Sequence, residues 1–301
     1  MRWKKTLAGL LLCGAMAAVM TACGEQDTPE PNVPDGKIEN QEDNDNLENQ
    51  DLSEALRSSK TLTAKSTEVL CSIPFPEGKP VDIVQGGWTD GKYFYQAFIG
   101  KDTENNELNN AVCIAKYDLE NQKTVKESEV LPLNHANDIT YNSRLDCLVL
   151  CNSNPRKNVI TYIDKDELTV IDQFEIGYDI FSIDYNEATD RYVVGIAGGQ
   201  TFCILDGNFQ PVSEIYDPTT RTTDCTTQGV GSDDEFIYFI LYNRNVITVY
   251  DWDGNFVTLI KLDISNSVEP ESIRILEDGI YIGASGAGMQ VYRIKGLLPE
   301  E

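Results

Sequence analysis

The sequence feature that most constrains the fold is a repeated pattern of short strands between residues 80 and 295. Five segments each contain a short strand, a polar turn, a second apolar strand, a gap and a third strand that ends at an acidic turn. The step from Gly87 to the next equivalent residue, Ile139, is 52 positions because the polar insertion Thr103–Asn110 lengthens the first unit. Steps of 44, 47 and 43 positions separate the remaining equivalents, Ile139, Ile183, Val230 and Ile273.

Short strands separated by turn signals, with a period near 45 residues, are typical of β-propeller blades. We therefore predict an all-β fold, a five-bladed β-propeller whose first strands line the axis. A two-sheet β-sandwich is the alternative, and the regular spacing disfavours it. The fifth unit stops at about Ile294, after its third strand, and we expect Ser66–Pro74 to pair with it, closing the ring and covering an open edge. In the first four units an acidic turn precedes an expected fourth strand, after Asp118, Asp164, Asp206 and Asp251.

The N-terminal segment has the pattern of an export signal. A basic start precedes the apolar stretch Leu7–Met20, which is too short for a confident membrane-spanning helix. The run from Met20 to Gly24 resembles the bacterial lipobox, and this resemblance implies removal of residues 1–22 and a diacylglycerol on the Cys23 thiol. An ordinary signal peptide followed by an incidental cysteine is the alternative. We expect a cell-surface protein, lipid-anchored to the outer side of the cytoplasmic membrane of a bacterium.

Residues 23–60 read as an anchor cysteine followed by a disordered acidic tether. Residues 24–54 contain eleven acids and one base, and three prolines interrupt any helix. Such a segment buries too little apolar surface to offset its ordering entropy, and its charges keep it extended. We interpret it as a spacer; a cation-binding acidic tail is the alternative. The propeller domain is expected over residues 61–301.

The net charge of the chain limits the kinds of partner that it can bind. The formal net charge of -25 argues against nucleic acid as a partner, because phosphate binding needs clustered Lys and Arg. We expect a monomer.

Cys147 and Cys151 are four positions apart on one strand and are too far apart to form a disulfide. Mostly free buried thiols are expected among the six domain cysteines, Cys71, Cys113, Cys147, Cys151, Cys203 and Cys225.

The run HANDITYN, residues 135–142, is similar to an inner-strand motif of the β-propeller lipoproteins of Gram-positive bacteria. A looser resemblance is to the gluconolactonase/regucalcin-like propellers, whose central channel holds a divalent cation. That resemblance implies Ca²⁺ or Mg²⁺ in the channel. The group has six blades, whereas five units are visible in this sequence.

The residues just ahead of the inner strands form the predicted site, because their loops converge at one end of the axis. Amide and carboxylate oxygens suit sugar hydroxyls or a hard cation, and aromatic rings can stack on a sugar face. Polar residues at an axis also hydrogen-bond neighbouring blades, which is the structural alternative. The predicted ligand-binding residues are Gln85, Trp88, His135, Asn137, Asp138, Asp179, Phe181, Gln228 and Glu271.

These features leave three functions open. The first is a membrane-anchored binding module for a glycan, a cell-wall fragment or a protein partner. The second is a metal-assisted lactonase or lyase, or a glycosidase, that uses Glu271, Asn137 and Asp179 at the channel mouth. The third is a scaffold in a surface complex. The run Asp251–Asn255 begins like a calcium loop, but its glycine comes too early, so we interpret it as a hairpin turn.

Overall fold

The computed structural model describes residues 51–101, 107–152, 157–197, 199, 201–216, 226–265, 267–286 and 288–300. They belong to a unit that extends from Asp45 to Glu301. The predicted signal peptide, the anchor Cys23, the tether up to residue 50 and Cys225 lie outside the described residues.

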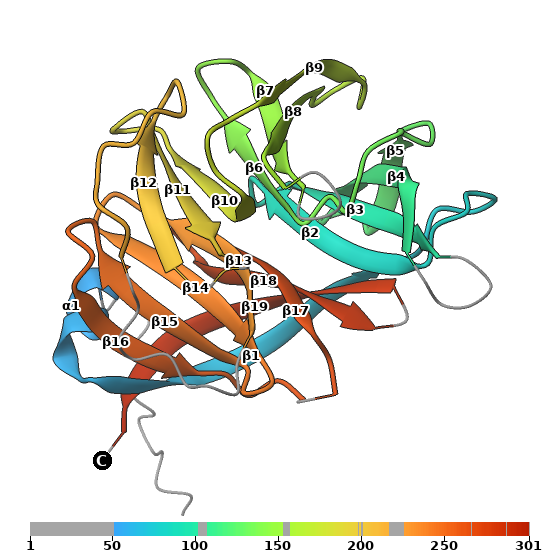
Figure 1. Ribbon diagram of the computed structural model, residues 1–301. Coiled ribbons are helices and arrows are strands. Elements are labelled where there is room, and N and C mark those ends of the chain that lie inside the picture. The colour runs from blue at the N-terminus through green and yellow to red at the C-terminus, as the bar shows by residue number, and fades with distance from the viewer. Residues whose placement is uncertain are drawn as a thin grey trace, which may run out of the picture. The chain divides into compact units, whose positions relative to one another are not determined.

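The described chain is built almost entirely from strands, as predicted (Figure 1). A short helix, α1 (Leu52–Ser58), precedes them, and Asp51 caps it by accepting the N–H of Ser53 at 2.9 Å. The strands are β1 (Thr61–Ile73), β2 (Ile83–Thr89), β3 (Tyr93–Lys101), β4 (Glu107–Asp118), β5 (Lys123–Glu127), β6 (Asp138–Asn142), β7 (Cys147–Cys151), β8 (Val159–Asp164), β9 (Val170–Glu175), β10 (Ile180–Asn186), β11 (Arg191–Ile196), β12 (Thr201–Asp206), β13 (Thr226–Ser232), β14 (Phe236–Tyr242), β15 (Val246–Asp251), β16 (Phe256–Lys261), β17 (Pro270–Leu276), β18 (Gly279–Gly286) and β19 (Gly288–Pro299).

These strands form four sheets. Two four-stranded sheets have the orders β2-β3-β4-β5 and β6-β7-β8-β9, and a three-stranded sheet has the order β10-β11-β12. The fourth sheet has eight strands in the order β13-β14-β15-β16-β1-β19-β18-β17. Neighbouring strands are antiparallel except for the pair β1 and β16.

Strand β1 explains why there are four sheets rather than the five separate ones expected. It pairs antiparallel with β19, from Leu62 opposite Pro299 to Ile73 opposite Met289. The predicted pairing of the N-terminal strand with the last unit is therefore confirmed, and β19 continues past Ile294 to Pro299. The first residues of β1, Thr61–Thr63, also pair parallel with β16, and this short ladder joins two groups of strands into one sheet.

The third group departs from the predicted pattern. A fourth strand was expected after Asp206, but the described residues there make only isolated bridges to β12, between Leu205 and Pro211 and between Phe202 and Tyr216. Pro211 has no backbone N–H to donate to a ladder, which weakens pairing at this edge.

The first strands of the five units lie beside one another around a common centre. Strand β2 contacts β6, β6 contacts β10, β10 contacts β13, β13 contacts β17, and β17 contacts β2, so the five strands close a cycle. Two glycines permit the close approach. A Cβ added to Gly86 would lie 2.4 Å from the Cα of Asp138, and one added to Gly229 would lie 3.0 Å from the Cα of Ser272. The inner strands thus meet backbone to backbone.

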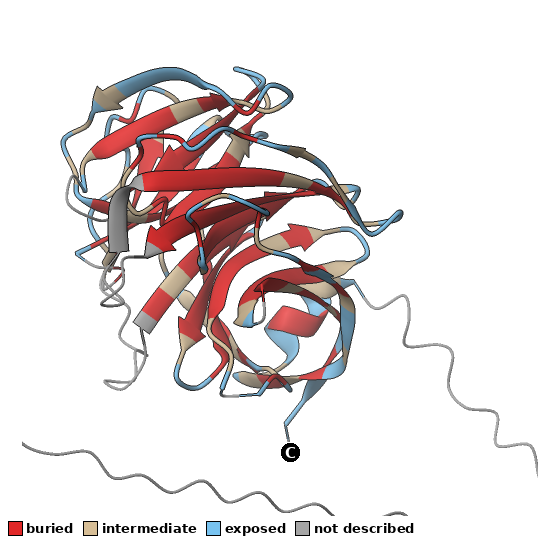
Figure 2. Cartoon of the chain, turned by 90° about the vertical axis from the view of Figure 1, so that its right-hand side faces the viewer, coloured by how far each residue is buried: buried red, intermediate tan, exposed pale blue. Residues whose placement is uncertain are grey.

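Apolar clusters lie between neighbouring groups of strands. The buried residues lie mainly on the strands (Figure 2). One cluster brings Trp88 and Ile114 against Leu148, and another brings Val149 against Tyr192. The five described domain cysteines, Cys71, Cys113, Cys147, Cys151 and Cys203, are buried free thiols, as predicted.

Helix α1 belongs to the folded domain. Its Ala55 and Leu56 are buried in the same cluster as residues of β16 and β19, and Arg57 forms an ion pair with Glu235 at 2.6 Å. The prediction of a disordered tether up to residue 60 is therefore wrong for residues 52–60. The buried face of the helix supplies the apolar surface that the acidic segment before it lacks.

Candidate functional site

The two ends of the inner strands have different side chains and surroundings. The N-terminal ends bear most of the predicted site residues. The C-terminal ends, with the turns that follow them, line a large cavity.

At the N-terminal end, Asn137 links neighbouring inner strands. It is buried, its side-chain amide donates to the carbonyl of Phe181 at 2.7 Å, and its backbone N–H donates to the carbonyl of Cys151 at 3.0 Å. These contacts match the structural alternative, in which a polar residue at the axis joins two groups of strands.

Asp138 has a similar role at the start of β6. Its Oδ2 accepts the backbone N–H of Ile183 at 3.1 Å and of Val230 at 3.3 Å, and its Oδ1 accepts the N–H of Ile139 at 2.9 Å. Burial raises the pKa of Asp138 well above its ordinary range, while the three N–H donors favour the ionised form. One carboxyl group thus connects β6, β10 and β13.

Glu271 has no such partner. It is 6% exposed, and none of the described residues makes a hydrogen bond to its carboxyl group. Burial raises the pKa of Glu271 well above its usual range, and the charges of Glu269 and Asp138 raise it further. The amide of Gln228 donates to Glu269 instead. Glu271 is therefore a buried carboxyl group that favours the protonated form.

The remaining predicted residues at this end do not share one environment. Gln85 is buried, and its backbone carbonyl accepts the amide of Gln96 at 2.7 Å. His135 is half-buried in the loop before β6, and Phe181 is half-buried in β10. Asp179 is exposed directly before β10, so it is not part of the buried group.

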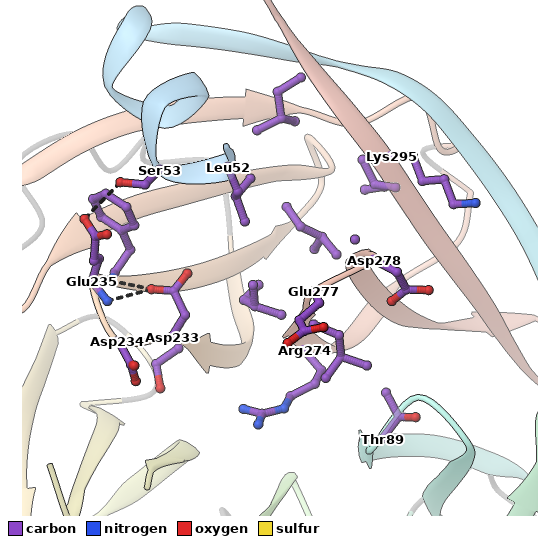
Figure 3. A pocket seen from close by; sticks show the side chains of 18 of the residues that line it. Leu52, Ser53, Thr89, Asp233, Asp234, Glu235, Arg274, Glu277, Asp278 and Lys295 are labelled. Atoms are coloured by element: carbon purple, nitrogen blue, oxygen red, sulfur yellow. Dashed lines mark hydrogen bonds between the residues drawn. The ribbon is translucent and has the colours of Figure 1, made fainter. Parts of the chain in front are cut away.

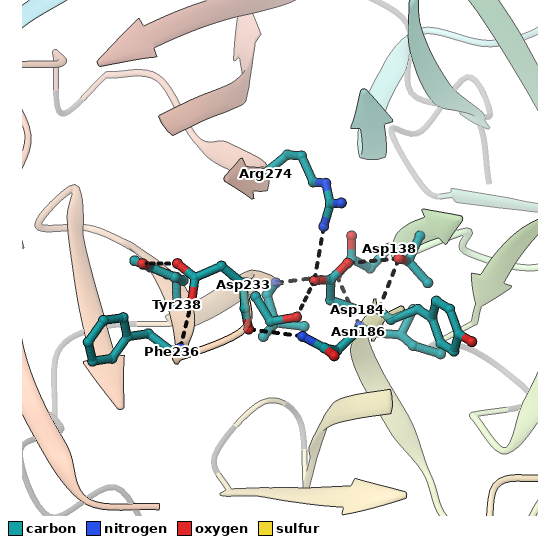
Figure 4. A network of polar contacts seen from close by, with 12 residues as sticks. Asp138, Asp184, Asn186, Asp233, Phe236, Tyr238 and Arg274 are labelled. Atoms are coloured by element: carbon teal, nitrogen blue, oxygen red, sulfur yellow. Dashed lines mark hydrogen bonds and ion pairs between the residues drawn. The ribbon is translucent and has the colours of Figure 1, made fainter. Parts of the chain in front are cut away.

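A second layer of polar groups lies further along the inner strands (Figure 4). Asp184, on β10, accepts hydrogen bonds from the hydroxyls of Thr140 and Ser232, each at 2.7 Å. Its Oδ2 also lies 3.4 Å from Nη1 of Arg274 on β17. Sequence reasoning missed Asp184, although an aspartate inside an apolar strand is a usable signal because a buried carboxylate requires donors.

The cavity at the C-terminal ends has a volume of about 1260 Å³ (Figure 3). All five inner strands or the turns after them contribute to its lining, together with α1, β1 and β19. Trp88 is the one predicted site residue that lines it. Tyr141 and Tyr185 add two more aromatic side chains, and the Trp88 and Tyr141 rings are 5.0 Å apart.

Arg274 lies in this cavity with few contacts. Its guanidinium is 5.8 Å from the Trp88 ring and reaches Asp184, but its buried Nε has no hydrogen-bond partner among the described residues. Trp88 beside it is 8% exposed.

Acidic side chains dominate the rest of the lining. Glu235 is paired with Arg57, and Asp278 with Arg293. The other exposed turns supply Glu187, Asp234 and Glu277, which have no hydrogen-bond or ion-pair partner among the described residues. The bases are Lys65, Arg274 and Lys295. Such a lining favours ligands with hydroxyl or amino groups.

Within the described ranges, neither a cluster of metal-ligating side chains nor a helix of membrane-spanning length is present. No group of three or more His, Cys, Asp and Glu side chains is arranged to hold a metal ion there. None of the helices in that part of the chain is long and apolar enough to cross a membrane.

No protein-family model matches the chain, and no curated protein matches it by sequence. Among solved structures, the chain is similar to Myxococcus xanthus glutaminyl cyclase, with a TM-score of 0.58 and 10% identity over 81% of this chain and 100% of that one. It is also similar to virginiamycin B lyase from Staphylococcus aureus (TM-score 0.40, 16% identity, 75% and 69% coverage). A third is a β-propeller domain from Myceliophteria thermophila (0.43, 9%, 76% and 100%).

At 10% identity the likeness to the glutaminyl cyclase shows the fold alone, and the structures similar to this chain are β-propellers. They include enzymes and binding domains, so the fold does not select between these functions. The expected similarity to lipoproteins and to the gluconolactonase/regucalcin-like group has no support from a sequence match.

Proposed function

We propose that this protein is a lipid-anchored, extracytoplasmic binding module, a five-bladed β-propeller that holds a glycan or a cell-wall fragment in the cavity at the C-terminal ends of its inner strands. Two features support five blades: the closed cycle of β2, β6, β10, β13 and β17, and the place of β1 beside β19, where it completes a fourth strand for the last group.

The anchor and the tether are part of the same proposal. A lipid on Cys23 would hold the chain at the outer face of the cytoplasmic membrane, and the acidic residues that follow would keep the domain away from the surface. The domain would then meet polymers of the cell wall or soluble fragments of them.

The observation that carries the binding function is the cavity itself. It combines aromatic rings with unpaired polar groups from five distant parts of the chain, which is the usual composition of a small-molecule site. The carboxyl groups of Asp138 and Asp184, in contrast, are occupied by hydrogen bonds that connect inner strands. This arrangement supports binding more directly than it supports acid–base chemistry at those two residues.

A matched pair of substitutions at the two ends of β10 tests the location. Glu187 follows β10 and lines the cavity, whereas Asp179 precedes β10 at the predicted channel mouth, and both are exposed. We expect Glu187→Arg to weaken binding of soluble cell-wall fragments by about tenfold, measured by isothermal titration calorimetry, because it puts a long cation at the cavity. Asp179→Arg should bind like the wild type. Weakening by Asp179→Arg alone would contradict the proposal and support the channel mouth.

The enzymatic alternative rests on Glu271. A buried carboxyl group with a raised pKa has the properties of a general acid. A lactonase, lyase or glycosidase at the channel mouth would lose its activity in Glu271→Gln and keep it in Glu187→Arg. Hydrolysis of cell-wall glycans or lactones by the wild type, abolished by Glu271→Gln, would favour this alternative over the binding module.

A further inference from the structure

The acidic and basic side chains that line the cavity indicate which class of ligand it binds. This inference rests on the proposed binding function. The lining contains eight Asp and Glu residues but only three bases, and one of the bases, Arg274, comes from an inner strand. A neutral glycan carries neither the anion that would satisfy an arginine nor the cations that would satisfy free carboxylates. A ligand with both kinds of charge fits better.

Among the described residues, the guanidinium of Arg274 has one hydrogen-bond partner, Asp184. Its contact with Asp184 is long, at 3.4 Å, and Asp184 already accepts two shorter hydrogen bonds from Thr140 and Ser232. The Nε of Arg274 is buried without a partner among the described residues, whereas the side chain as a whole is 23% exposed, so a ligand in the cavity can reach the outer guanidinium nitrogens. The planar guanidinium matches the geometry of a carboxylate. A ligand carboxylate would supply the missing acceptor.

Trp88 strengthens this argument independently. It is 8% exposed, it lines the same cavity, and its ring lies 5.0 Å from the ring of Tyr141. The Arg274 guanidinium lies over the Trp88 ring, 5.8 Å from its centroid, so an aromatic surface adjoins the cation. Together the two side chains present a cation and an aromatic ring to the cavity.

The carboxylates that would bind a ligand amine are on three turns. Glu187, Asp234 and Glu277 follow β10, β13 and β17, are exposed and lack partners among the described residues. Figure 3 shows Glu277 next to Arg274, and Asp234 beside Asp233. Ammonium groups are the ligands that such carboxylates recognise by charge-assisted hydrogen bonds.

We propose that the cavity binds a short peptide with a free carboxylate and at least one free amine, the carboxylate at Arg274 and Trp88 and the amine among Glu187, Asp234 and Glu277. Such a peptide could be free in solution or form part of a cell-wall fragment. The shared chemistry is the pair of opposite charges.

Calorimetric titration of the full chain in detergent tests the inference with five probes. Lysyl-alanine is compared with its C-terminal amide and with its form in which both amines are acetylated. A cell-wall disaccharide that carries its peptide is compared with the same disaccharide without the peptide. We expect amidation and acetylation each to weaken binding by about tenfold or more, and the peptide-bearing disaccharide to bind more tightly than the bare one.

Substitution of Arg274 identifies the carboxylate contact. Arg274→Gln should bring the affinity for free lysyl-alanine down to that of its amide and leave the affinity for the amide unchanged. Arg144→Gln is the matched control, because Arg144 lies in the turn after β6, pairs with Asp190 and does not line the cavity. If Arg274→Gln unfolds, Arg274→Lys, which keeps the charge but loses the fork, should show a smaller loss in the same direction.

The outcomes separate the two proposals. Equal binding of the free peptide and its amide, or tight binding of the bare disaccharide, overturns the peptide inference but leaves the binding module standing. If none of the probes binds, both proposals fail. If the peptide-bearing disaccharide binds more tightly than lysyl-alanine and loses affinity in Arg274→Gln, the source is the cell wall. If lysyl-alanine binds as tightly and loses affinity on amidation, a free peptide is sufficient.

Discussion

The carboxylate of Asp138 accepts the backbone N–H of Val230 at 3.3 Å, although 92 positions separate the two residues in the sequence. The same Oδ2 atom accepts the N–H of Ile183. Three inner strands therefore depend on one side chain, and each of the two backbone donors is buried and has this carboxylate as its partner.

This arrangement predicts that Asp138→Asn lowers the free energy of unfolding by about 1–3 kcal/mol. The asparagine keeps the size of the side chain but replaces one acceptor oxygen with an NH₂ group, which leaves at least one buried N–H unpaired. Urea denaturation measures the change. Asp179→Asn, in an exposed position, is the control and should have no effect. An unchanged midpoint for Asp138→Asn would mean that its contacts do not stabilise the cycle of strands.

The close approach of β2 to β6 gives a second prediction about the same place. A Cβ on Gly86 would lie 2.4 Å from the Cα of Asp138, a backbone atom that cannot move independently. Gly86→Ala should therefore cost about 2 kcal/mol or more, because the two strands must separate. Gly177→Ala is the control, since nothing lies within 4 Å of the added atom. Equal thermal stability of the two variants would contradict the packing described for β2 and β6.

The strand pattern could be predicted from the sequence because it depends on local alternation and turn chemistry. The Asp251 carboxylate, for example, accepts the N–H groups of Asp253 and Asn255 and so forms the hairpin turn that the sequence indicates. The pairing of β1 with β19 could also be predicted, because an unpaired edge needs a partner. Both predictions used only local sequence patterns and the rule that an open sheet edge needs a pairing strand.

The cavity could not be predicted in this way. It depends on side chains from five strands and a helix that meet only after folding, and Arg274 lies in a strand sequence with no recognisable motif. The parallel ladder of β1 with β16 was also unexpected, because three residues of a long strand carry it. Glu271 was predicted as a site residue, and the structure adds that its carboxyl group is buried with like charges nearby.

Removal of β1 should destabilise the domain. Deletion of residues 1–76 exposes the edge of β19 and the end of β16, and unpaired edges favour aggregation. We expect a lower melting temperature and oligomers in size-exclusion chromatography with light scattering. Deletion of residues 1–50 is the matched control, since it leaves α1 and β1 in place. A monomeric 77–301 fragment with unchanged melting would show that β1 is dispensable.

The lipid anchor on Cys23 makes a prediction that is independent of the fold. Cys23→Ala removes the thiol that would be acylated, so the protein should be released or stay unprocessed, and it should not incorporate labelled fatty acid. Cell fractionation and metabolic labelling measure both effects. Cys13→Ala, within the signal segment, should behave as the wild type. Membrane retention of a processed Cys23→Ala protein would exclude the anchor.

The last prediction concerns the pH dependence of stability and follows from Glu271. Burial, with Glu269 and Asp138 nearby, raises the pKa of Glu271 above the value of 4.5 that it has when exposed. Between that value and its folded pKa, the folded protein holds a proton that the unfolded chain has released. Stability therefore decreases as pH rises through this window, by about 1.4 kcal/mol per unit of the pKa difference.

Glu271→Gln removes this titration and keeps the size of the side chain. The variant should be close to the wild type in stability near pH 4.5 and more stable than the wild type at pH 8, measured by urea denaturation across that range. Glu277→Gln, which changes an exposed carboxyl group at the other end of β17, is the control for the change in net charge. If Glu271→Gln is instead less stable at every pH, the ionised carboxylate is a partner that the folded state requires, and the protonated form is not the native one.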